Sequence, residues 1–117
     1  MAMAFNDIER RRVENAVDAF LAKRRPPAHI RPKLDFGYRL SDQSVELLEI
    51  RPQWDDPLII RQYPIAKATY VRCRNLWKVF WKRADLKWHS YEPHPTTKTI
   101  DEFLTVVDAD DHCCFFG

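Results

Sequence analysis

Glycine is scarce in this sequence, with only Gly37 and Gly117 among its 117 residues. Nucleotide-binding loops need several glycines, because only a residue without a side chain lets the backbone turn tightly against a phosphate. The sequence therefore excludes the phosphate-binding loops that depend on a run of glycines. It also contains no internal repeat and no low-complexity segment, which excludes a solenoid or a disordered linker.

Long apolar runs and a cysteine pattern typical of disulfides are missing as well. No stretch approaches the roughly 18 consecutive apolar residues of a membrane-spanning helix, and the charged segment 1–14 does not resemble a secretion signal. The isolated Cys73 and the adjacent Cys113 and Cys114 make a poor disulfide framework and suit a reducing compartment. We therefore expect a cytoplasmic protein with no membrane partner.

The chain contains enough hydrophobic residues to form one core. Hydrophobic residues make up 45% of the chain and charged residues 31%, with a net charge of +2. This balance is too apolar for a disordered chain, and the length suits one compact domain. We therefore expect residues 1–117 to form a single domain.

Two helices are predicted, one near each end of the chain. Asn6 and Glu9 have the spacing of a capping box, and the apolar stripe that follows ends near Arg25, before a Pro-Pro pair. Thr99 and Glu102 repeat the capping pattern ahead of a second, shorter stripe that ends near Asp108. Each stripe predicts a helix with one buried face.

The middle of the chain predicts an antiparallel sheet, because short β-branched and aromatic runs alternate with turn residues. The acids and prolines around Trp54 predict an irregular loop over residues 51–57. The fold class is therefore α+β, with the N-terminal helix and the short C-terminal helix packed on one face of a four- or five-stranded antiparallel sheet. The expected strands are residues 34–40, 45–51, 65–73, 77–83 and 86–91, with turns at 41–44 and 74–75.

Positive charge gathers in one segment. Residues 61–91 carry eight Lys or Arg residues against Asp85 alone, interleaved with aromatic residues, whereas residues 92–117 carry six acids and one lysine. Basic groups among aromatic rings are typical of surfaces that bind single-stranded nucleic acid, through phosphate contacts and base stacking. The expected phosphate contacts are Arg72, Arg74, Lys78, Lys82 and Lys87, and the expected stacking platforms are Trp81 or Trp88.

Two other interpretations of the same segment remain open. The aromatic residues could belong to the core, with the acidic segments folded over the cations as a neutralising cover. Alternatively, an open face or edge of the sheet could be covered by a second copy, giving a homodimer.

An enzymatic alternative centres on His89. A metal-independent ribonuclease needs a general base, a general acid and a nearby cation, and His89, Glu92 and Lys87 could supply them. On an extended strand, Lys87 and His89 share a face with Tyr91. A lone histidine on a sheet surface is the competing interpretation.

No metal or cofactor site is predicted. Asp56, Asp85 and Lys87 only loosely match the carboxylate and lysine pattern of metal-dependent nucleases, and Asp85 fits a turn cap better. The segment 108–114 has every ligand type, but no zinc-site spacing. Several residues receive no role: Trp54, Asp55, Asp56, Asp110, Asp111, His112, Cys113 and Cys114. Phe115 and Phe116 predict a docked C-terminus, because exposing two phenyl rings is unfavourable.

Four stretches together resemble one known family. They are residues 24–31 (RRPPAHIR), 51–57 (RPQWDDP), 87–93 (KWHSYEP) and 115–117 (FFG). In these stretches the chain resembles the bacterial domain-of-unknown-function family numbered 3024, and the match covers nearly the whole chain. The resemblance implies a small, stand-alone, intracellular bacterial protein, and it assigns no activity to any residue.

Overall fold

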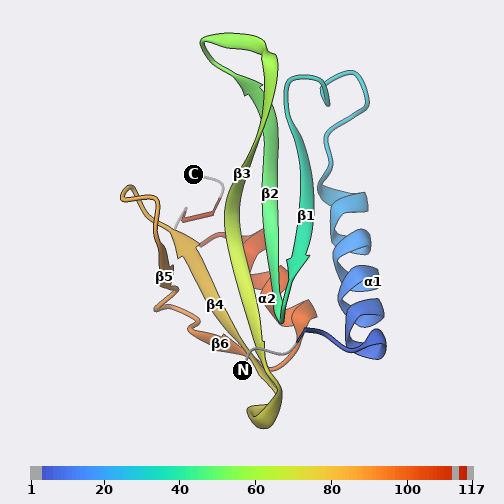
Figure 1. Ribbon diagram of the computed structural model, residues 1–117, viewed down its shortest axis with the longest axis vertical. Coiled ribbons are helices and arrows are strands. Elements are labelled where there is room, and N and C mark those ends of the chain that lie inside the picture. The colour runs from blue at the N-terminus through green and yellow to red at the C-terminus, as the bar shows by residue number, and fades with distance from the viewer. Residues whose placement is uncertain (1–3, 112–113, 116–117) are drawn as a thin grey trace.

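The computed structural model describes residues 4–111 and 114–115. Within them the chain forms two α-helices and one six-stranded antiparallel sheet in the order β1-β2-β3-β4-β5, with β6 also paired to β4 (Figure 1). The predicted α+β class and the two terminal helices are confirmed.

The first helix, α1 (Asp7–Arg24), begins at the predicted capping box. The Asn6 side chain accepts a hydrogen bond from the Glu9 backbone N–H, and the Glu9 carboxylate accepts one from the Asn6 backbone N–H. Arg25 is already extended, because the Pro-Pro pair that follows cannot continue a helix. The helix buries one stripe against the sheet, made of Val13, Val17 and Leu21.

The first two strands, β1 (Asp35–Ser41) and β2 (Ser44–Gln53), form the predicted hairpin. Their two-residue turn places Asp42 at φ 53°, a left-handed conformation that aspartate tolerates better than most residues. The register pairs Ser41 with Ser44, as the turn prediction at residues 41–44 requires.

The predicted loop over residues 51–57 is wrong. Strands β2 and β3 (Asp56–Val71) continue through most of this segment, and only Trp54 and Asp55 form the turn. Strand β1 pairs with β2 as far as Ile50, and β4 pairs with β3 only from Ala66 onward. The end of the hairpin is therefore a two-stranded ribbon, in which proline is tolerated because each strand has an open edge.

The second hairpin also differs from its prediction at the turn. Strand β3 ends at Val71, and residues Arg72–Arg74 form a short 3₁₀ helix before β4 (Leu76–Lys82). Asn75 follows at φ 50°. The predicted strand over residues 65–73 is therefore wrong at its end, because residues 72 and 73 lie in a 3₁₀ turn, which does not have the two-residue period of a strand.

The fifth strand is shorter than predicted. Strand β5 covers Trp88–Ser90 only, because residues 83–87 form a turn in which Leu86 has φ 62°. Strand β6 (Thr96–Thr97), which the sequence did not predict, extends the edge beside β5 by pairing with β4.

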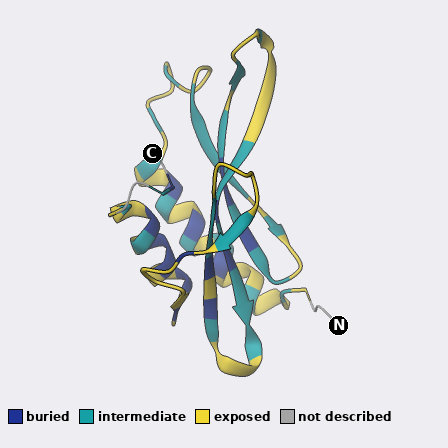
Figure 2. Ribbon diagram, turned by 90° about the vertical axis from the view of Figure 1, so that its left-hand side faces the viewer, coloured by how far each residue is buried: buried dark blue, intermediate teal, exposed yellow. Residues whose placement is uncertain are grey.

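The core lies between the sheet and both helices. Helix α2 (Ile100–Ala109) begins at the predicted Thr99 cap and buries four residues, and these belong to the same cluster as the buried stripe of α1. Figure 1 shows α2 behind the sheet, and Figure 2 shows the buried residues concentrated where helices and sheet meet. Phe115 joins this core and packs on Tyr91 with ring centroids 4.8 Å apart, so the predicted docking is confirmed for Phe115, whereas Phe116 lies outside the described residues.

Candidate functional site

The sheet face away from the helices is the first candidate surface. Val45, Ala68 and Val79 lie side by side in the register and are buried under the helices. Side chains alternate along each strand, so the residues next to them project from the opposite face. On β3, β4 and β5 that opposite face carries three lysines and two aromatic rings, which we call the basic face: Lys67, Lys78, Phe80, Lys82 and Trp88.

Within the basic face, lysines lie over aromatic rings. The Lys67 ammonium is 5.0 Å from the ring centroid of Phe80 and 5.1 Å from that of Trp88. The Lys82 ammonium is 5.3 Å from the Trp88 ring. The register accounts for this arrangement, because Lys67 is directly opposite Phe80, and Lys82 is directly opposite Trp88. Cation–π attraction holds these ammonium groups close to the rings.

Acidic groups of the C-terminal segment lie elsewhere. Asp108, on α2, forms an ion pair with Arg24 of α1 at 2.8 Å, and the Asp110 carboxylate accepts the backbone N–H of Phe115 at 3.1 Å. Helix α2 packs on the opposite face of the sheet from the basic face (Figure 1). The nearest acid in the register is Glu46, opposite Lys67, and its carboxylate is bound by Arg39. The neutralising cover considered above is therefore not formed by α2.

The remaining predicted nucleic-acid contacts are dispersed. Trp81 lies on the helix-facing side of the sheet with Trp77 and Val79, and packs against the core. Arg74 is exposed in the 3₁₀ turn, at the far end of β4 from Lys82, and Lys87 is exposed in the turn before β5. The structure thus brings together Lys78, Lys82 and Trp88. It adds Phe80 from the same face of β4, and Lys67, which only the cross-strand register identifies.

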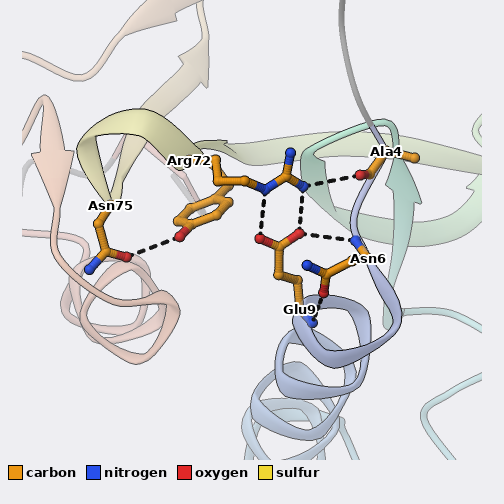
Figure 3. Close-up of polar contacts among 6 residues, drawn as sticks. Ala4, Asn6, Glu9, Arg72 and Asn75 are labelled. Atoms are coloured by element: carbon orange, nitrogen blue, oxygen red, sulfur yellow. Dashed lines mark hydrogen bonds and ion pairs between the residues drawn. The ribbon is translucent and has the colours of Figure 1, made fainter.

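Arg72 is engaged in a different contact. Its guanidinium donates to the Glu9 carboxylate at 2.6 and 2.9 Å, and to the Ala4 carbonyl at 3.2 Å (Figure 3). These hydrogen bonds from Arg72, together with the Asn6 backbone N–H, lower the pKa of Glu9 to about 2. Arg72 is not part of the basic face, because its guanidinium group already forms a charge-assisted bidentate pair with Glu9.

A cleft opens beside His89. It has a volume of about 430 Å³ and is lined by Trp81, Arg83, His89, Ser90, Tyr91, Glu92, Pro93 and Cys114. The His89 Nε2 atom is 2.8 Å from the Asp85 carboxylate, which also accepts the Lys87 backbone N–H at 2.9 Å. Both contacts lower the pKa of Asp85, and the hydrogen bond from the Lys87 backbone N–H has the larger effect.

The residues predicted for a ribonuclease site, His89, Glu92 and Lys87, are only partly brought together. Glu92 is exposed and lines the same cleft as His89, whereas Tyr91 is buried under the core ring of Phe115. The predicted grouping of Lys87, His89 and Tyr91 on one strand face is wrong, because β5 covers only Trp88–Ser90. Sequence reasoning missed the contact of His89 with Asp85, although it identified Asp85 as a turn cap, which the structure confirms.

No metal-ligand cluster is found among residues 4–111 and 114–115: no three His, Cys, Asp or Glu side chains gather there. Asp56 instead accepts the backbone N–H of Leu58 at 3.2 Å in the hairpin turn. His112 and Cys113, which receive no role from the sequence, lie outside the described residues. Neither helix in the described part of the chain has the length and apolar character needed to cross a bilayer.

Comparison with known proteins gives one family match. The family model described as "Domain of unknown function (DUF3024)" matches residues 5–117. No curated protein and no solved structure matched the chain.

Proposed function

The chain belongs to the DUF3024 family, and we propose that it binds single-stranded nucleic acid through its basic face. The observation that carries the proposal is the group of three lysines and two rings on the sheet face that the helices leave uncovered. Unpaired strands suit such a surface, because their phosphates meet ammonium groups while their unstacked bases lie flat on aromatic rings.

Binding would exchange one set of contacts for another. In the free protein, the ammonium groups of Lys67 and Lys82 lie over the rings of Phe80 and Trp88. A phosphate attracts an ammonium group more strongly than a ring does, so a bound strand would draw the lysines toward its backbone. The ring faces would then be available for bases.

We also place this function in the cytoplasm, where exposed thiols such as that of Cys73 stay reduced.

The test is a fluorescence-anisotropy titration of a labelled single-stranded oligonucleotide. We expect affinity to fall steeply as salt rises, because bound phosphates release counterions. The Lys67→Glu/Lys82→Glu double variant should lose most of the affinity. A matched control, Lys23→Glu/Lys33→Glu, makes the same charge change at exposed positions away from the basic face and should retain more of it. Absent binding, or an equal loss in both variants, would reject the basic face as the binding surface.

Base stacking is tested separately at Trp88. Trp88→Ala should weaken binding by about 1–3 kcal/mol with little change in the salt dependence, since stacking contributes no counterion release. Trp88→Phe keeps a ring and should retain part of the affinity. If both variants bind as the unmodified protein does, stacking on Trp88 is refuted.

A second candidate function rests on the hydrogen bond between His89 and Asp85. A carboxylate that binds one ring nitrogen orients the histidine as a general base, and Arg83 in the same cleft could stabilise a phosphorane. This arrangement fits a metal-independent ribonuclease. It predicts RNA cleavage that persists in EDTA and is abolished in His89→Ala and reduced in Asp85→Asn. Intact labelled RNA after incubation with the pure protein would exclude it.

A further inference from the structure

The end of the long hairpin has an unusual open edge. Strand β4 pairs with β3 from Ala66 to Val71, so on the side away from β2, residues 56–65 have no partner strand in the described part of the chain. Pro57 and Pro64 interrupt this edge, and between them lie six residues, of which every second one directs its backbone N–H and C=O away from β2. Exposed edges of this kind readily pair with another strand.

The same segment exposes large apolar side chains. Leu58 is 92% exposed, Ile60 is 56% exposed, and Trp54 at the turn is 89% exposed. Figure 2 shows this end of the hairpin as one of the most exposed parts of the chain. Apolar groups gathered at a projecting edge are typical of an interaction surface, because burying them against a partner releases ordered water.

Charge along the edge indicates which partner fits. The turn at one end carries Asp55 and Asp56, whereas β4 stops at Lys82 beside the other end, followed by the exposed Arg83 and Lys87. A second β3 laid antiparallel on this edge would run in the opposite direction. Its acidic turn would therefore arrive at the basic end of β4, and the two-fold symmetry would make the same contact twice.

We propose that the β3 edge between Pro57 and Pro64 is a dimer interface with a second copy of this chain. Two copies pair these edges antiparallel, bury Leu58, Ile59 and Ile60, and bring the acidic turn of each to the cations that follow β4 in the other. The interface goes beyond the nucleic-acid function, because it uses the edge of the sheet at the hairpin end rather than the basic face.

Sedimentation velocity on the full chain, without nucleic acid, tests the proposal. We expect a concentration-dependent species of twice the 14.0 kDa chain mass. Leu58→Lys/Ile60→Lys should shift the protein to monomer, whereas the control Ile8→Lys, at a similarly exposed apolar residue on α1, should not. A protein that is monomeric at every concentration, or a dimer unaffected by the edge variant, would overturn the proposal.

A charge exchange tests the antiparallel orientation. Asp55→Lys/Asp56→Lys places like charges at both contacts, and Arg83→Glu/Lys87→Glu does the same with the opposite sign. Each variant alone should dimerise more weakly than the unmodified chain. A mixture of the two should recover a mixed dimer, because each turn then meets a site of opposite charge. If the mixture stays as monomeric as its components, the antiparallel contact is wrong.

Discussion

Arg72 and Glu9, 63 residues apart in the chain, form a bidentate ion pair with N–O distances of 2.6 and 2.9 Å. The pair joins the turn between β3 and β4 to the first turn of α1. The same carboxylate accepts the Asn6 backbone N–H at 3.0 Å, so one side chain completes the helix cap and anchors the hairpin (Figure 3). Glu9 therefore takes part in both the cap of α1 and the ion pair with Arg72.

The ion pair should contribute measurably to stability. Arg72→Ala should lower the free energy of unfolding by more than a neutral surface substitution does, because it removes a bidentate charged pair with the Glu9 carboxylate. Urea denaturation measures this, and a double-mutant cycle with Glu9→Gln should give a favourable coupling free energy between the two side chains. The control Arg74→Ala, at an exposed residue of the same 3₁₀ turn, should change stability by less than about 0.5 kcal/mol.

Glu9 should also give stability an acid dependence. Its pKa falls from 4.5 to about 2 on folding, so its contribution is present in full above pH 4.5 and is lost as pH falls toward 2. Glu9→Gln removes that contribution. The difference in unfolding free energy between the two proteins should therefore shrink across this interval, as urea titrations at stepped pH would show. A difference that stays constant from neutral pH to pH 2 would contradict the assignment.

Phe115 should behave as a core residue despite its place near the end of the chain. It is 5% exposed and packs on the buried Tyr91 ring. Phe115→Ala should cost about 3 kcal/mol, because it removes a buried ring and leaves a cavity. Thermal denaturation measures the loss, with the exposed Ile8→Ala as control. A midpoint as high as that of the control would show that Phe115 does not complete the core.

Leu86 offers a stabilising substitution. It is 76% exposed and has φ 62°, a left-handed conformation that is unfavourable for a leucine and costs glycine nothing. Leu86→Gly should therefore raise the unfolding free energy by about 0.5 kcal/mol, the relief of strain exceeding the greater entropy of the unfolded glycine. A lower urea midpoint would contradict this expectation.

Local signals in the sequence predicted the helices and the first hairpin well. Both capping patterns and the apolar stripes specify helices without reference to the rest of the chain, and α1 and α2 begin where Asn6 and Thr99 indicate. Strand alternation is equally local, because Trp77 and Val79 on β4 are buried while Lys78 between them is exposed. Such signals suffice because capping and strand alternation act between near neighbours.

The candidate site could be predicted only in part. Lys67 and Phe80 become neighbours through the register of two strands, and His89 meets Asp85 only because the chain reverses between them. Residues 51–57 were misassigned because prolines and acids suggest a loop, although a two-stranded ribbon tolerates them at its open edges.

The order of amino acids alone specifies where the helices begin, where the first hairpin turns, and that positive charge gathers between residues 61 and 91. Tertiary structure alone decided which cations lie together. It paired Arg72 with Glu9 and brought Lys67 over the Trp88 ring. The physical reason is distance along the chain: these contacts depend on strand register and on helix packing, which no local pattern of residues encodes.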